Sequence, residues 1–151
     1  STHSHNTVVV DNRNQSIIWS GFRLAQRANI TILEDNLPLI EAEHDGYRSL
    51  GVNHKRSFDF QEKSIQITDN VIGKDSVVKE FHLHFAPGIT ATQTNNSINI
   101  QDIGVIKFIG NTTIRVEEYE MADGYNKYKV GKKIVVNFVS HLITNIQFNK
   151  L

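Results

Sequence analysis

The stretch SFDFQEKSIQITDNVIG, residues 57–73, alternates apolar and polar side chains on both sides of a short polar turn. Because successive side chains of a β-strand point to opposite faces, this alternation is typical of half-buried antiparallel strands. The same period of two recurs along most of the chain, in runs rich in Ile, Val, Thr and Phe. The further runs are TVVVD, LIEAE, EFHLHF, SINIQD, VIKFIG, TIRVEEYE, KIVVNFV and ITNIQF.

Ten or more such runs and no amphipathic helical pattern predict an all-β fold, namely an antiparallel β-sandwich. Polar segments rich in Gly, Asn and Asp separate the runs, and no Ser/Gly linker or repeat divides the chain. We therefore expect residues 1–151 to form a single β-sandwich domain. The segments interpreted as its loops are EHDGYRSLG, DNVIGKD, APGIT, TNNS and ADGYNKYKVGKK.

The composition excludes several classes of function. Sixteen basic and sixteen acidic residues leave no net charge, so no general attraction to nucleic acid or to an anionic membrane is expected. The absence of cysteine excludes disulfides, thiolate zinc sites and cysteine nucleophiles. No apolar run approaches the roughly 18 residues that a membrane-spanning helix needs, so no membrane span is predicted.

Two His-x-His pairs are candidate metal ligands. His3 and His5 would share one face of a strand if the strand that follows already includes them. His82 and His84 share a face with Glu80 and resemble half of a cupin metal motif, but the segment FAPGIT lacks the Glu that completes it. We favour histidines hydrogen-bonded within a sheet face over a metal site, because one strand rarely completes a metal site.

The segment EHDGYRSLGVNHKRSFDF gathers Tyr47, Arg48, His54 and Arg56 around one turn. An Arg fork suits a carboxylate, and Tyr and His can hydrogen-bond hydroxyl groups, so the cluster is a candidate site for an acidic sugar. The alternative is a solvated hairpin whose charges pair with one another. The lysine-rich segment YNKYKVGKK is interpreted as a solvated loop rather than a nucleic-acid site.

Four segments in order resemble one family. STHSHNTVVVDNRNQSIIWSGFRLAQRA is similar to a segment of heparinase II/III-type polysaccharide lyases, and AEHDGYRSLGVNHKRSFDF, ITDNVIG and FHLHFAPG resemble its following motifs. The resemblance covers residues 1 to about 88, and beyond Gly88 only the strand pattern is alike.

This resemblance implies an activity for a longer protein. In that bacterial family a helical toroid precedes a large antiparallel sandwich, and an acidic, uronate-containing polysaccharide such as a glycosaminoglycan or alginate is cleaved by β-elimination. We expect this chain to be the C-terminal sandwich fragment of such a protein, with the N-terminal helical toroid and all catalytic residues upstream of Ser1. The resemblance also implies a periplasmic or extracellular location.

The resemblance assigns roles to particular residues as well. In members with bound zinc, the residue matching His5 is one ligand, and its partners, a His and an Asp, are expected upstream of Ser1. The fragment itself is expected to need no cofactor. If the turn near Gly46 faces the cleft between toroid and sandwich, Tyr47, Arg48, His54 and Arg56 contact uronate; alternatively they brace the sandwich through ion pairs.

Two questions stay open at this point. The chain is either a domain of a polysaccharide lyase or a non-catalytic carbohydrate-binding or structural sandwich module. As an isolated piece, we expect it either to self-associate through exposed sheet edges or to form a complete smaller sandwich.

Overall fold

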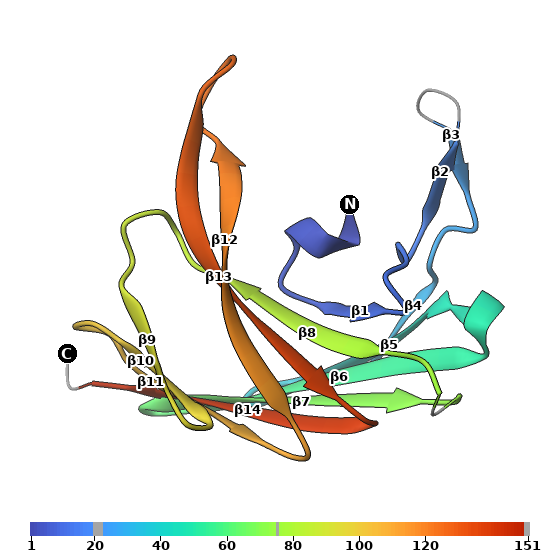
Figure 1. The fold of residues 1–151 in the computed structure, drawn as a ribbon. Helices are drawn as coiled ribbons and strands as arrows, with labels where there is room; N and C mark the ends of the chain where they lie inside the picture. Colours follow the sequence, from blue (N-terminus) through green and yellow to red (C-terminus); the bar gives the residue numbers. More distant parts are fainter. Residues whose placement is uncertain (20–22, 75, 150–151) are drawn as a thin grey trace.

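The protein folds as two antiparallel β-sheets that face each other, which confirms the predicted all-β sandwich (Figure 1). The computed structural model describes residues 1–19, 23–74 and 76–149. In this part of the chain helical structure is limited to two single turns of 3-10 helix, η1 (Thr2–Ser4) and η2 (Arg48–Leu50). No helix in the described ranges is long and apolar enough to cross a membrane.

The larger sheet has eight strands and forms the base of the molecule in Figure 1. Neighbouring strands in it are antiparallel, and most of them are hairpin partners in sequence. In spatial order they are β4 (Ile30–Asn36), β5 (Leu39–Tyr47), β6 (Val52–Gln61), β7 (Ser64–Ile72), β14 (His141–Phe148), β11 (Gly104–Ile109), β10 (Ser97–Ile100) and β9 (Ala91–Thr94).

The smaller sheet crosses above it and has four strands, in the order β1 (Val8–Val10), β8 (Lys79–His84), β13 (Tyr128–Phe138) and β12 (Thr113–Ala122). A separate hairpin pairs β2 (Ile17–Trp19) with β3 (Arg23–Ala25). Figure 1 shows this hairpin and the far end of the β12–β13 hairpin rising on opposite sides of the N-terminal turn.

The hydrophobic core lies between the two sheets. Apolar side chains at alternate positions of each strand meet there, as the period of two requires. From the smaller sheet come Val8, Phe81 and Ile134, and the larger sheet contributes Ile106 and Leu142. These side chains expose at most 1% of their surface, so the core is closed to water at its centre.

All ten predicted runs are strands, and four strands were missed: β2, β3, β4 and β9. The interpretation of YNKYKVGKK as a loop is wrong for its larger part, because β13 begins at Tyr128 and pairs with β12 from there on. The segment EHDGYRSLG is also more ordered than predicted, since β5 continues to Tyr47 and η2 follows it. Polar cross-strand pairs such as Glu118 and Lys132 carry β12 and β13 beyond the core.

Candidate functional site

Contacts between the sheets join the segments that carry the family resemblance. The Tyr47 hydroxyl at the end of β5 donates to the Val8 carbonyl of β1 at 2.8 Å. The Arg56 guanidinium on β6 donates to the carbonyl of Asn6 at 2.8 Å, and the His82 amide of β8 donates to the Thr7 carbonyl at 2.9 Å. Segments up to 78 residues apart therefore converge on residues 6–8, where β1 begins.

A buried carboxylate lies at the centre of this region. Asp69 on β7 is fully buried, and its two oxygens accept from Arg56 at 2.7 and 3.1 Å. The His54 Nε2 atom lies 2.6 Å from Asp69 Oδ1. Burial opposes ionisation, but the Arg56 charge and the hydrogen bonds from His54 and Arg56 hold the pKa of Asp69 below its ordinary value. Arg56 and Asp69 thus form an ion pair across neighbouring strands β6 and β7 of the larger sheet, on the face that meets the smaller sheet.

A second histidine extends the chain of hydrogen bonds. The Gly46 amide donates to His44 Nδ1 at 3.1 Å, so that nitrogen carries no proton, and His44 Nε2 lies 3.0 Å from His54 Nδ1. Since His54 Nε2 donates to the Asp69 carboxylate, the consistent arrangement of hydrogen bonds has His44 Nε2 donating to His54 Nδ1. Burial, and then the nearby His54 and Arg56, lower the pKa of His44 from 6.5 to about 4. All four ring nitrogens are thus occupied within the fold.

The four predicted sugar-binding residues lie in two different environments. Tyr47 and His54 are 2% exposed, and burial raises the pKa of the Tyr47 phenol to about 12. Arg56 is committed to Asp69. Only Arg48 presents its guanidinium to solvent, with 43% of the side chain exposed. Glycan contact by these residues stays a prediction, and Arg48 is the member placed to make it.

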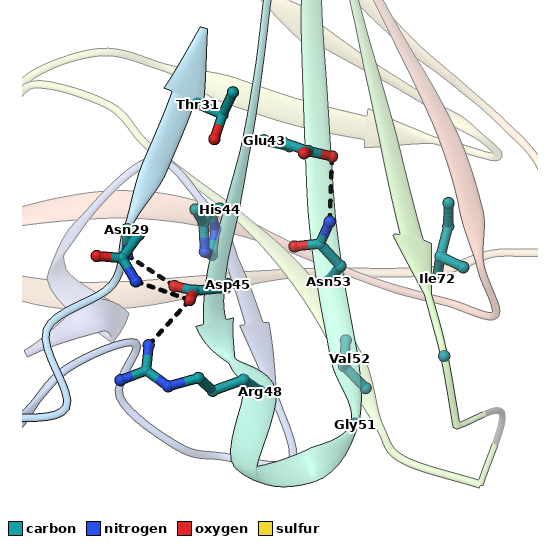
Figure 2. A pocket seen from close by; sticks show the side chains of 11 residues that line it. Asn29, Thr31, Glu43, His44, Asp45, Arg48, Gly51, Val52, Asn53 and Ile72 are labelled. Atoms are coloured by element: carbon teal, nitrogen blue, oxygen red, sulfur yellow. Dashed lines mark hydrogen bonds and ion pairs between the residues drawn. The ribbon is translucent and has the colours of Figure 1, made fainter. Parts of the chain in front are cut away.

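Arg48 borders an open cavity of about 540 Å³ on the outer face of the larger sheet (Figure 2). The Asp45 carboxylate organises its wall: it accepts from the Asn29 amide nitrogen at 2.7 Å, from Asn29 Nδ2 at 2.9 Å and from Arg48 at 3.1 Å. Hydrogen bonds from Asn29 and the Arg48 charge lower the pKa of Asp45. The lining residues are Asn29, Thr31, Glu43, His44, Asp45, Arg48, Gly51, Val52, Asn53, Ile72 and Gly73.

The chemistry of this cavity suits hydroxyl groups better than a free anion. Asp45 already balances the charge of Arg48, and Glu43 accepts from Asn53 Nδ2 at 3.1 Å. Amide, carboxylate and guanidinium groups side by side can both donate to and accept from sugar hydroxyls. Asn29 and Asn53 were not predicted, because only the pairing of β5 with its neighbours brings them beside Asp45 and Glu43.

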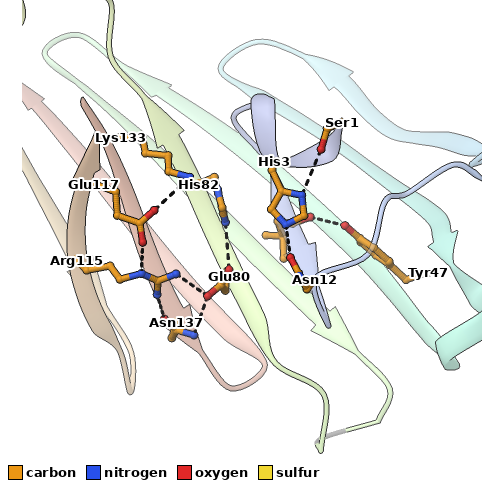
Figure 3. A network of polar contacts seen from close by, with 11 residues as sticks. Ser1, His3, Asn12, Tyr47, Glu80, His82, Arg115, Glu117, Lys133 and Asn137 are labelled. Atoms are coloured by element: carbon orange, nitrogen blue, oxygen red, sulfur yellow. Dashed lines mark hydrogen bonds and ion pairs between the residues drawn. The ribbon is translucent and has the colours of Figure 1, made fainter. Parts of the chain in front are cut away.

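His82 of β8 belongs to a polar network on the outer face of the smaller sheet (Figure 3). His82 Nε2 lies 3.3 Å from Glu80 Oε2, and Glu80 accepts from Arg115 at 2.8 Å. Although burial opposes it, the hydrogen bonds from Arg115 and His82 lower the pKa of Glu80. His84 lies 3.1 Å from Asn6 Oδ1. The prediction that these histidines are hydrogen-bonded within a sheet face is confirmed.

The N-terminal histidines do not share a strand face as expected, because residues 2–4 form η1 and β1 begins only at Val8. His3 packs edge-on against His82 and lies 2.7 Å from Asn12 Oδ1, whereas His5 is exposed. Within the described residues no three His, Asp or Glu side chains are placed to hold a metal ion. These residues therefore do not by themselves fit the zinc that the resemblance implies for His5.

Comparison with known proteins gives one family and one fold. The family model "Heparinase II/III-like, C-terminal" matches residues 1–149, so the likeness extends well past Gly88. The fold is similar to that of heparan sulfate lyase HepC from Pedobacter heparinus (TM-score 0.72, 18% identity, 99% of this chain and 25% of that one). It is also similar to the heparinase III BT4657 gene product (TM-score 0.73, 18% identity, 99% and 24%). No curated protein sequence matches.

Proposed function

This chain belongs to the heparinase II/III-like family, as a C-terminal domain of it, and from that membership we propose that it serves a polysaccharide lyase acting on uronate-containing glycans. The observation that carries the proposal is the family match over nearly the whole chain. The chain spans about a quarter of the length of the solved structures it resembles, and both of those are lyases or heparinases by name. The lyase activity is accordingly assigned to a longer protein.

The proposed reaction is β-elimination. A base removes the proton from the carbon beside the uronate carboxylate, the electron pair forms a carbon–carbon double bond, and the bond to the leaving oxygen breaks as that oxygen takes a proton. Such a base needs a free nitrogen or oxygen facing the substrate. His44 and His54 use all their ring nitrogens inside the fold, and the Tyr47 hydroxyl donates to Val8.

We therefore place the base and the proton donor in the part of the protein outside this chain. The role proposed for the chain is to support the cleft and to hold His5 near it. His5 would contribute to a metal site only with ligands from elsewhere. From the same family membership we propose that the full protein acts in the periplasm or outside the cell.

The test compares the full-length protein with this chain alone. Both are incubated with heparan sulfate, other glycosaminoglycans and alginate, and the ultraviolet absorbance of the unsaturated product is followed. The proposal expects the chromophore from the full-length protein on at least one uronate polymer and none from this chain. An inactive full-length protein on every polymer contradicts the lyase assignment, and activity of the chain alone contradicts the placement of the catalytic groups.

A second function, carbohydrate binding without catalysis, is favoured by one observation, the polar cavity beside Arg48. Calorimetric titration of the chain with oligosaccharides from the same polymers tests it. Arg48→Ala should weaken binding several-fold if the cavity is the site. Arg13→Ala is the matched control, since Arg13 is also an exposed arginine near an aspartate, with 58% of its side chain exposed, but lies outside this cavity. Equal affinity of both variants excludes the cavity.

A further inference from the structure

The two sheets do not overlap fully. β1 is an edge strand of the smaller sheet. Its Val8 carbonyl accepts from Tyr47 of β5, and the Asn6 carbonyl just before it accepts from Arg56 of β6. Strand β4 and the outer half of β5 extend beyond that line. The inner face of the larger sheet is therefore covered over β14, β11 and the part of β7 from Ile67 to Val71, and left open toward the β4 edge and toward the first residues of β7.

The open part of this face is apolar. Register places Ile32 beside Ala42, Ile40 beside Phe58, and Phe60 beside Ile65. Residues directly opposite in an antiparallel sheet point to the same face, so these side chains lie on the face that carries Arg56 and the core. We call this surface the open face, and its residues are Ile30, Ile32, Ile40, Ala42, Phe58, Phe60 and Ile65.

Side chains of the open face are far more exposed than their buried neighbours on the same side of the sheet. His54 is 2% exposed, whereas Phe60, Ile32 and Ile30 are 36%, 65% and 73% exposed. A hollow of about 200 Å³ lies between Thr7, Phe58 and Ile30. The open face is continuous with the core, because Phe58 pairs with the buried Ile67 in the next strand. A row of apolar side chains that begins in the core therefore ends in solvent, which is unusual for a completed sandwich.

We infer that the open face is a docking surface for the part of a longer lyase chain that precedes residue 1. The inference rests on the proposed function, because it takes that longer chain as the occupant. Relatives of similar fold have about three quarters of their length outside the matched portion. The charges beneath are already neutralised, since Arg56 is paired with Asp69, so an apolar segment can cover the surface without burying an unpaired charge.

A matched pair of substitutions tests this. Ile32→Lys places a charge on the open face, and Ile109→Lys places one on the opposite face of the same sheet, where Ile109 is 55% exposed. Thermal unfolding is measured for each variant in this chain and in the full-length protein. In this chain both variants should have the same unfolding midpoint. In the full-length protein Ile32→Lys should lower the midpoint of the domain by roughly 4 °C or more relative to Ile109→Lys.

Two results would overturn the inference. Equal effects of the two substitutions in the full-length protein show that the preceding part does not cover this surface. The second result combines two measurements. If this chain forms dimers in sedimentation velocity that Ile32→Lys dissociates, and the two variants have equal unfolding midpoints in the full-length protein, the occupant is a second copy of this chain. Lyase activity of the full-length wild type is measured separately, so an inactive protein that still shows the stability difference refutes the proposed function and leaves the docking surface standing.

Discussion

Replacing Asp69 by Asn should destabilise the domain strongly. The substitution keeps the shape but removes the only carboxylate within salt-bridge distance of Arg56 among the described residues, and just 15% of the Arg56 side chain is exposed. Removing one partner of a buried ion pair costs about 3–5 kcal/mol, and the partial exposure of Arg56 favours the lower end. Against a total stability of about 5–15 kcal/mol, this is a large fraction. A loss of about 3 kcal/mol lowers the unfolding midpoint by roughly 6–12 °C for a domain of this size.

Urea denaturation followed by circular dichroism measures this loss. Asp35→Asn on β4 is the control, because Asp35 is exposed and should change stability by less than about 0.5 kcal/mol. A double-mutant cycle with Arg56→Met should give a coupling energy above about 1.5 kcal/mol, since the two residues act as a pair. If Asp69→Asn unfolds at the same urea concentration as Asp35→Asn, the ion pair does not stabilise the domain and the reasoning fails.

Three further outcomes follow from the same region. Tyr47→Phe leaves the buried Val8 carbonyl without its donor and should cost about 1–3 kcal/mol in urea denaturation. Gly46→Ala should cost a similar amount, because a Cβ there would lie 3.0 Å from the Gln15 Cβ atom and 3.1 Å from that of Ala28. The pKa of His44 falls from 6.5 to about 4 on folding, so the unfolded chain binds a proton more readily and stability drops as pH decreases from about 6.5 to 4. Thermal unfolding at pH 7 and pH 4.5 should show a smaller drop for His44→Gln than for the wild type; an equal drop in both would assign the pH dependence to other groups.

Alternation of apolar residues was sufficient to predict most strands but not β4 and β9 at the two edges of the larger sheet, nor the β2–β3 hairpin. The segment ITILEDN of β4 was missed because a bulge between Ile32 and Glu34 breaks its period of two. Strand β9, ATQT, has one buried residue and therefore no apolar face to detect. The first part of β13, within YNKYKVGKK, was predicted as a loop because it is rich in lysine and pairs with β12 partly through charged residues.

Ion-pair bracing by Arg56 was one of the two predicted alternatives, but its partner Asp69 was not predicted, although the signal was present. Ile65, Ile67, Asp69 and Val71 occupy one phase of β7, and three of these four side chains are apolar. A carboxylate in the apolar phase of a strand has to find a partner in the core. Which partner it finds depends on the register of β6 against β7, because Arg56 stands directly opposite Asp69. That register is set by the whole sheet and cannot be obtained from either strand alone.

Polar residues of the family-like segments have a structural role that follows from where they point. Tyr47 and Arg56 belong to the larger sheet, and each donates to a carbonyl beside or within β1 of the smaller one. Apolar contacts alone would let the two layers slide, because hydrophobic attraction has no direction. Directed hydrogen bonds from buried donors fix one offset between the sheets. The same offset places His5 and the N-terminal turn relative to the cavity beside Arg48, so these buried residues determine the geometry of the proposed glycan site without contacting a glycan themselves.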